Sequence, residues 1–124
     1  MTDAEFFNLL DLRTKKMKFI LASKAKEYAR GDRMHNFKCG ALPLKCTPER
    51  FLVFLWMKHV VSILDMVNDL DSGNINTVKL WNEKLTDGIN YLALLEGLIM
   101  ERFPRELRKI TRMNLLGLQK NKDK

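Results

Sequence analysis

Cysteine, proline and glycine are all scarce in this sequence of 124 residues, which contains 2, 3 and 6 of them respectively. Two cysteines cannot build the dense disulfide framework of a small secreted domain, so Cys39 and Cys46 are expected to be ordinary reduced thiols. The chain also has no glycine-rich phosphate loop and no G-x-S-x-G elbow, so P-loop and serine-hydrolase chemistry find no support. With so few prolines, long helices can run without interruption.

Long apolar runs are missing as well. The longest, FLVFLWM at residues 51–57, falls far short of the roughly 20 residues that a membrane-spanning helix needs. The first residues, MTDAEFF, carry acids where a signal peptide would carry a basic start and then an apolar stretch. Hydrophobic residues nevertheless make up 46% of the chain, enough for one core at this length. We therefore expect a cytoplasmic protein without a membrane partner.

Most of the sequence shows helical periodicity. No stretch alternates in the manner of a strand, whereas apolar residues recur at helical spacing along most of the chain. The pattern predicts an all-α protein with three long helices, at about residues 3–30, 48–71 and 77–103, and a shorter basic helix at about 104–119. Residues 32–47 are expected to form an irregular connector.

Capping signals mark two of these boundaries. Thr47 is suited to cap the second long helix, because Pro48 fits the first helical position and Glu49 favours the positive end of the helix dipole. Gly31 follows the first helix in the position that favours a left-handed cap.

Charge is unevenly distributed around a net charge of +7. Residues 51–100 carry 3 basic and 6 acidic side chains, whereas residues 101–124 carry 8 basic and 3 acidic ones. An acidic middle between basic ends suits a metal–phosphate site with basic groups around it. We divide the chain into a helical bundle over 1–103 and a basic helix and tail over 104–124. The tail is either a solvated helix or a nucleic-acid contact through its basic cluster: Arg102, Arg105, Arg108, Lys109 and Arg112.

A polar stripe interrupts the otherwise apolar third long helix. On a helical wheel with ~100° per residue, Asp87 and Asn90 fall within about 40° of Glu83. A helix that is apolar on most sides is mostly buried, so we expect this stripe to face other parts of the protein. Buried carboxylates need cations, metal or hydrogen-bond donors as partners.

The second long helix repeats this spacing with Lys58, Ser62 and Asp65. Its opposite face is apolar enough to anchor it, which would leave the polar stripe in water. Phe54 and Leu55, however, continue the same face toward the start of the helix. Both interpretations therefore remain open.

If both stripes face inward, their carboxylates meet between antiparallel helices. Asp65, Glu83 and Asp87 would then form a site for Mg²⁺, which takes oxygen ligands and keeps waters for a phosphate substrate. Lys58 would contact phosphate or neutralise a carboxylate.

The stretch KAKEYARGDRMHNF, residues 24–37, ends the first helix with many hydrogen-bonding groups. On the functional interpretation, Asp32, Arg33, His35 and Asn36 close the magnesium site from the side. On the structural interpretation, Asp32 and Asn36 cap a short helix and His35 packs locally.

Three stretches together resemble a known family. KAKEYARGDRMHNF, TPERFLVFLWMKHVVSILD and EKLTDGINYLALLE are similar to small phage and prophage proteins related to the all-α nucleoside triphosphate pyrophosphohydrolases, the MazG and dimeric dUTPase group. The resemblance covers roughly residues 20–101. It implies a MazG-like bundle, with Asp87 in the position of the metal-binding aspartate and Glu83 close to that of the glutamate. It also implies Mg²⁺-dependent cleavage between the α and β phosphates of a nucleotide.

The sequence departs from the family pattern both in the helix before this motif and within the motif. The family's Glu-x-x-Glu is absent, and KHVVSILD offers Lys58, Ser62 and Asp65 instead. Lys84 stands where the glutamate three residues before the aspartate is usual. A second hypothesis is therefore a non-catalytic phage-encoded binder, which sequesters a nucleotide signal or inhibits a host defence protein.

The main hypothesis is a homo-oligomeric, nucleotide-binding all-α protein that hydrolyses its ligand with Mg²⁺. It assigns ten residues to three roles: metal binding by Asp65, Glu83 and Asp87, substrate contacts by Asp32, Arg33, Asn36, Lys58 and Ser62, and orientation of water or substrate by His35 and Asn90.

Zinc is a further alternative, since both histidines and both cysteines fall within a short segment. Their spacing, H-x3-C-x6-C-x12-H from His35 through Cys39 and Cys46 to His59, fits no standard zinc finger or knuckle. Reduced thiols remain the simpler interpretation.

Overall fold

The structure, a computed structural model, describes residues 1–28 and 30–122, with side chains up to residue 114. Five helices follow one another: α1 (Asp3–Tyr28), α2 (His35–Ala41), α3 (Pro48–Asp71), α4 (Val78–Glu101) and α5 (Pro104–Lys122). No strand occurs in the described ranges, so the expected all-α class is confirmed.

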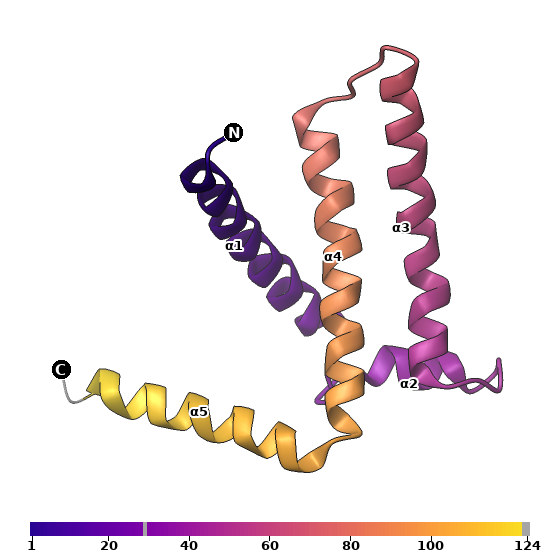
Figure 1. The fold of residues 1–124 in the computed structure, drawn as a ribbon. Coiled ribbons are helices and arrows are strands. Elements are labelled where there is room, and N and C mark those ends of the chain that lie inside the picture. Colours follow the sequence, from indigo (N-terminus) through magenta and orange to yellow (C-terminus); the bar gives the residue numbers. More distant parts are fainter. Residues whose placement is uncertain (29, 123–124) are drawn as a thin grey trace.

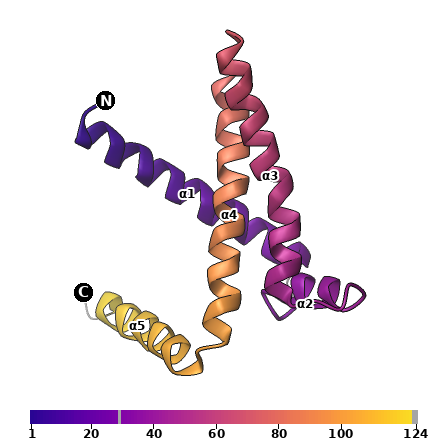
Figure 2. The same cartoon turned by 45° about the vertical axis from the view of Figure 1, so that its right-hand side comes forward.

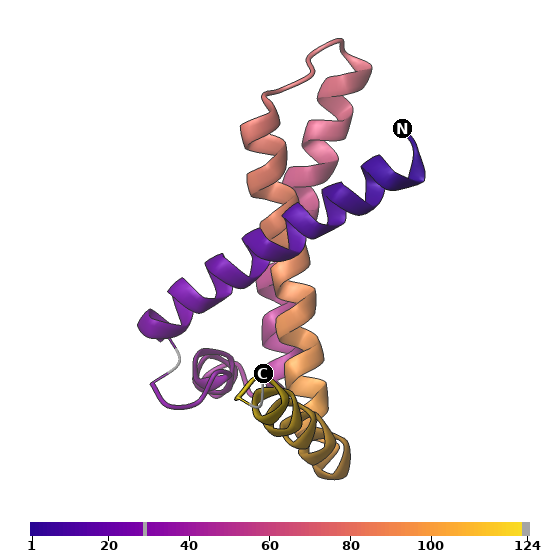
Figure 3. The ribbon, with the colours of Figure 1, turned by 90° about the vertical axis from the view of Figure 1, so that its left-hand side faces the viewer.

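The helices are arranged around one hairpin. α3 and α4 run side by side in opposite directions, and α2 lies across the end of the hairpin where α3 begins (Figures 1 and 2). α1 crosses α4 obliquely (Figure 3), and α5 leaves the end of α4 and runs away from the hairpin (Figure 1). Two of the five helices therefore extend well beyond the hairpin.

Local signals set the helix boundaries. The Thr47 hydroxyl accepts a hydrogen bond from the Arg50 backbone N–H, with Pro48 at the first helical position. Thr77 caps α4 in the same way through the Leu80 N–H. Gly31 has a φ of +85°, a left-handed conformation that glycine adopts without strain. The predicted start of α3 and the glycine after α1 are both confirmed.

The prediction of an irregular connector over residues 32–47 is wrong in part, because it contains α2. This helix buries Phe37 and Ala41, four residues apart on one face. It also approaches α3 closely at Gly40, where a Cβ atom would collide with the Phe51 ring. Tertiary packing thus stabilises a helix too short to show a clear period in the sequence.

The core is small and lies where α2 meets the hairpin. It consists of Met34, Phe37, Leu52 and Leu98. Partly buried side chains pack around these four: Phe51, Leu55, Tyr91, Leu94 and Leu95. Leu52 has no exposed surface, so this end of the hairpin is the most firmly packed part of the described chain.

Polar contacts join α1 and the start of α3 to α4. Arg13 of α1 donates hydrogen bonds to the backbone and side-chain oxygens of Asn82, each at 2.9 Å, and to the Thr86 hydroxyl. Arg102 forms a bidentate ion pair with Glu49, with N–O distances of 2.5 and 2.9 Å. The first contact fixes where α1 crosses α4, and the second ties the end of α4 to the start of α3.

Candidate functional site

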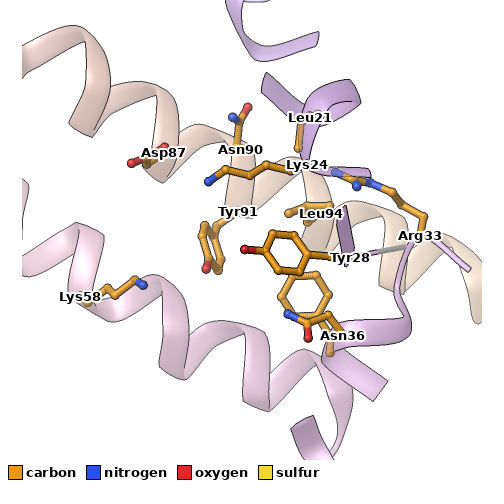
Figure 4. A pocket seen from close by; sticks show the side chains of 11 residues that line it. Leu21, Lys24, Tyr28, Arg33, Asn36, Lys58, Asp87, Asn90, Tyr91 and Leu94 are labelled. Atoms are coloured by element: carbon orange, nitrogen blue, oxygen red, sulfur yellow. The ribbon is translucent and has the colours of Figure 1, made fainter. Parts of the chain in front are cut away.

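A pocket of about 290 Å³ lies beside the core, where α1, α2, α3 and α4 come together. This is close to the lower end of the roughly 300–1,000 Å³ typical of small-molecule sites. Figure 4 shows side chains from all four helices, and Arg33 from the loop before α2, around one space. The lining consists of Leu21, Lys24, Tyr28, Arg33, Asn36, Phe37, Lys58, Asp87, Asn90, Tyr91 and Leu94.

The pocket carries an excess of positive charge. Lys24, Arg33 and Lys58 line it from three different segments, whereas Asp87 is its one carboxylate. Within the part of the chain that the structure describes, none of these four groups forms an ion pair. Three cations that are not neutralised by neighbouring carboxylates favour an anionic ligand.

Aromatic rings form the apolar part of the pocket. Tyr28 and Tyr91 both turn toward the space in Figure 4. Phe37 packs edge-on against Tyr91, with ring centroids 6.3 Å apart and an interplanar angle of 71°. Such rings offer flat faces on which a planar group can stack, while the lysines and the arginine remain available for charged groups.

Asn90 is buried at the back of the pocket. Its side chain is 4% exposed, and its Oδ1 atom has no hydrogen-bond partner among the described residues. An unpaired buried amide oxygen costs roughly 1–3 kcal/mol, and few such atoms persist in folded proteins without an explanation. The oxygen has almost no accessible surface, so a donor in the pocket can reach it only if the Asn90 amide turns.

Two titratable side chains next to Asp87 have shifted pKa values. Burial raises the pKa of Tyr91, and the negative charge of Asp87 raises it further. Burial lowers the pKa of His59, against the opposing effect of Asp87. The His59 and Tyr91 rings lie 4.8 Å apart, and His59 Nε2 is buried without a partner in the described part of the chain. At neutral pH both side chains therefore favour their uncharged forms.

Half of the ten predicted site residues line this pocket. They come from both polar stripes and from the segment after α1: Arg33, Asn36, Lys58, Asp87 and Asn90. The segment 24–37 does form one wall, as the functional interpretation expected, because Lys24, Tyr28 and Phe37 also lie in it.

The three predicted metal ligands do not come together. Asp65 and Glu83 are exposed, and Glu83 instead pairs with Lys84 at 3.6 Å. Across the described residues no group of three or more His, Cys, Asp or Glu side chains could hold a metal ion. Asp65 lies seven residues beyond Lys58, roughly 10 Å along α3, and so projects past the pocket. The structure therefore does not bring the three carboxylates together, contrary to the prediction from the sequence.

The other predicted residues, Asp32, His35 and Ser62, lie outside the pocket lining. Asp32 accepts a hydrogen bond from the Met34 N–H at 2.9 Å and pairs with Lys38 at 2.7 Å, and these contacts hold the pKa of its carboxyl below the usual value. His35 lies against Cys39, with Nε2 3.5 Å from Sγ, outside the pocket lining. Ser62 is half-buried and also outside it. Asp32 thus lies outside the pocket lining, but it does not cap α2, whose N-cap residue is Met34 without a side-chain cap hydrogen bond.

The alternative zinc site does not assemble. Among the described side chains, His35 and Cys39 are neighbours, but they form no metal-binding group with Cys46 or His59. The two cysteines are free thiols.

The prediction from the sequence omitted part of the pocket lining, although the helical spacing of the omitted residues indicates it. Leu21, Lys24 and Tyr28 lie three and four residues apart, so they share the face of α1 that turns toward α4. Tyr91 follows Asp87 by four residues and therefore shares its face. The same helical spacing therefore predicts that polar and aromatic side chains share these faces of α1 and α4.

Basic side chains of α5 are exposed and lie outside the pocket. Arg105, Arg108, Lys109 and Arg112 are all on this helix, which runs away from the hairpin (Figure 1). Any nucleic-acid contact through them would therefore use a separate surface.

Comparison with known proteins matched no family model, no curated protein and no solved structure.

Proposed function

We propose that the pocket binds a nucleotide or a nucleotide-derived phosphate ester. The observation that carries the proposal is the combination of three cations without ion-pair partners among the described residues and of aromatic rings in one cavity. Lys24, Arg33 and Lys58 would hold the phosphates, and Tyr28 and Tyr91 would contact the base. The Asn90 amide, once turned toward the ligand, would hydrogen-bond the base or sugar, which gives the site a means of selection.

The lining does not fit a resident metal ion, since Asp87 is its one carboxylate among the residues that the structure describes. Divalent magnesium binds proteins through few carboxylates and completes its shell with water and substrate phosphates. Any Mg²⁺ would therefore enter as the counter-ion of the ligand's phosphates. We therefore propose binding ahead of metal-dependent turnover.

Hydrolysis of the bound nucleotide, as in the MazG-like pyrophosphohydrolases, is the stronger form of the same proposal. The observation in its favour is Asp87, a carboxylate set among cations that would hold the phosphates. A carboxylate in this position can accept a proton from an attacking water. Asp87→Asn removes that capacity while keeping the size and hydrogen-bonding groups of the side chain.

Binding and hydrolysis are separated by one set of measurements. Calorimetric titration with ribo- and deoxynucleoside mono- and triphosphates, with and without Mg²⁺, should give a dissociation constant in the micromolar range for at least one of them. Pyrophosphate release from that nucleotide, lost in Asp87→Asn, would establish turnover. Binding without product would establish a binder that sequesters its ligand. Absence of binding to every nucleotide would refute the proposal.

A further inference from the structure

The described chain has far more accessible surface than a folded monomer of its size. Its accessible area is 9803 Å², whereas a compact monomer of 14.5 kDa exposes about 6,900 Å². The excess is about 2,900 Å². A standard protein interface removes about 800 Å² from each partner, and obligate homodimers remove more. The excess means that much of the surface is uncovered, on α1 and α5 as well as on α3.

Part of this surface is an apolar stripe on α3. Phe54, Met57, Val61 and Leu64 are 55%, 44%, 50% and 56% exposed, and we call these four residues the outer stripe. Their spacing of three, four and three residues is that of the contact positions in a coiled coil. The buried residues of α3, Leu52 and Met66, lie on the side that faces the hairpin. The outer stripe thus has no cover within the described chain.

We infer that the outer stripe is the contact surface for a second copy of this chain, with the two α3 helices antiparallel. A symmetric dimer places the same patch on both sides of its axis, and a stripe with coiled-coil spacing can interlock with its own copy.

The charges along α3 agree with this direction. Its exposed charges are basic in the first half, at Arg50 and Lys58, and acidic in the second half, at Asp65 and Asp71. An antiparallel pair brings the basic half of one helix to the acidic half of the other, whereas a parallel pair would align like charges. The charge pattern therefore selects one of the two orientations.

A lipid bilayer fits the outer stripe less well, although α3 is long and apolar enough to cross a membrane by length and composition alone. From Phe54 to Leu64 the outer stripe rises roughly 15 Å along the helix, compared with about 30 Å for the hydrocarbon core of a membrane. Lys58 lies within this span and Asp65 directly follows it, and both would be charged in lipid.

Sedimentation equilibrium of the full chain tests the inference. The wild-type protein should have twice the mass of the monomer at micromolar concentration. Val61→Lys places a charge in the centre of the outer stripe and should raise the dimer dissociation constant at least 100-fold. Val78→Lys is the matched control, because Val78 is an equally small, exposed helical residue outside the stripe, and it should leave the dimer intact.

A crosslinking experiment does not depend on the folding of the lysine variant. In a background with Cys39→Ser and Cys46→Ser, Val61→Cys should be joined into dimers by a short bis-maleimide, whereas Val78→Cys should not. A wild-type protein that stays monomeric at hundreds of micromolar would overturn the inference. So would a dimer that Val61→Lys leaves unchanged, or binding to anionic lipid vesicles that Val61→Lys abolishes.

Discussion

Replacing Asn90 by leucine is expected to stabilise the ligand-free protein while weakening its binding of a nucleotide. The side chain is 4% exposed and its Oδ1 atom is buried without a partner among the described residues. Leucine has nearly the same shape and no polar atom, so it removes the desolvation cost of about 1–3 kcal/mol. It also favours a helix by roughly 0.5 kcal/mol more than asparagine.

After allowance for imperfect packing of the branched side chain, we expect the free energy of unfolding to rise by about 1–2 kcal/mol. For a chain of this length that corresponds to a melting temperature higher by roughly 3–10 °C. Urea unfolding followed by circular dichroism measures the change. All variants are compared at one protein concentration, because self-association makes apparent stability depend on concentration.

Asn8→Leu is the matched control, since Asn8 is an exposed residue of α1 and gains the same helix propensity. It should change the free energy of unfolding by no more than about 0.5 kcal/mol. In calorimetric titration, Asn90→Leu should lose at least ~10-fold in nucleotide affinity, equal to one lost hydrogen bond. If Asn90→Leu instead lowered the stability while the control did not, the amide oxygen would have a partner in the fold. The argument for an oxygen reserved for a ligand would then fail.

Two further predictions concern charged groups. Lys58→Ala should weaken nucleotide binding by about 10–100-fold and reduce its dependence on salt, because a charge-assisted contact with phosphate is lost, whereas the exposed Lys79→Ala should leave both unchanged. Equal effects of the two lysines would mean that only the overall charge matters. The Arg102 guanidinium lowers the pKa of Glu49 from 4.5 to about 2. Because the folded-state pKa is the lower one, the stabilisation by this pair is present above pH 4.5 and lost as the pH falls toward 2. Melting temperatures of wild type and Glu49→Gln should therefore converge over this range, and parallel curves would show that the pair contributes nothing.

The long helices could be predicted from the sequence because their signals are local. Thr47 with Pro48 starts α3 at the expected residue, and Gly31 has the positive φ expected after α1. Capping and helical periodicity depend on residues a few positions apart, which the sequence displays directly. α2 lacked such a signal, because its stability comes from the burial of Phe37 and Ala41 against distant residues.

The candidate site was predictable only in part. The spacing of Asp87 and Asn90 placed them on one face of α4, and both line the pocket. The same reasoning placed Asp65 and Glu83 in the site, but both are exposed. Helical spacing fixes which residues share a face, but it does not fix how far along that face a neighbouring helix reaches. The positions of α1 and α2 against the hairpin decide which part of each stripe is enclosed.

The sequence by itself therefore determined that this chain is all-α, where its long helices begin, and which polar residues share a helical face. Only the tertiary structure decided that the basic side chains Lys24, Arg33 and Lys58 meet in one pocket with a single carboxylate. It alone left the outer stripe of α3 without cover. The physical reason is the distance in sequence over which the interactions act. Helical hydrogen bonds and caps join residues that are near neighbours in the chain. Pockets and uncovered faces depend on the crossing angles between helices, which are set by packing between residues far apart in the sequence.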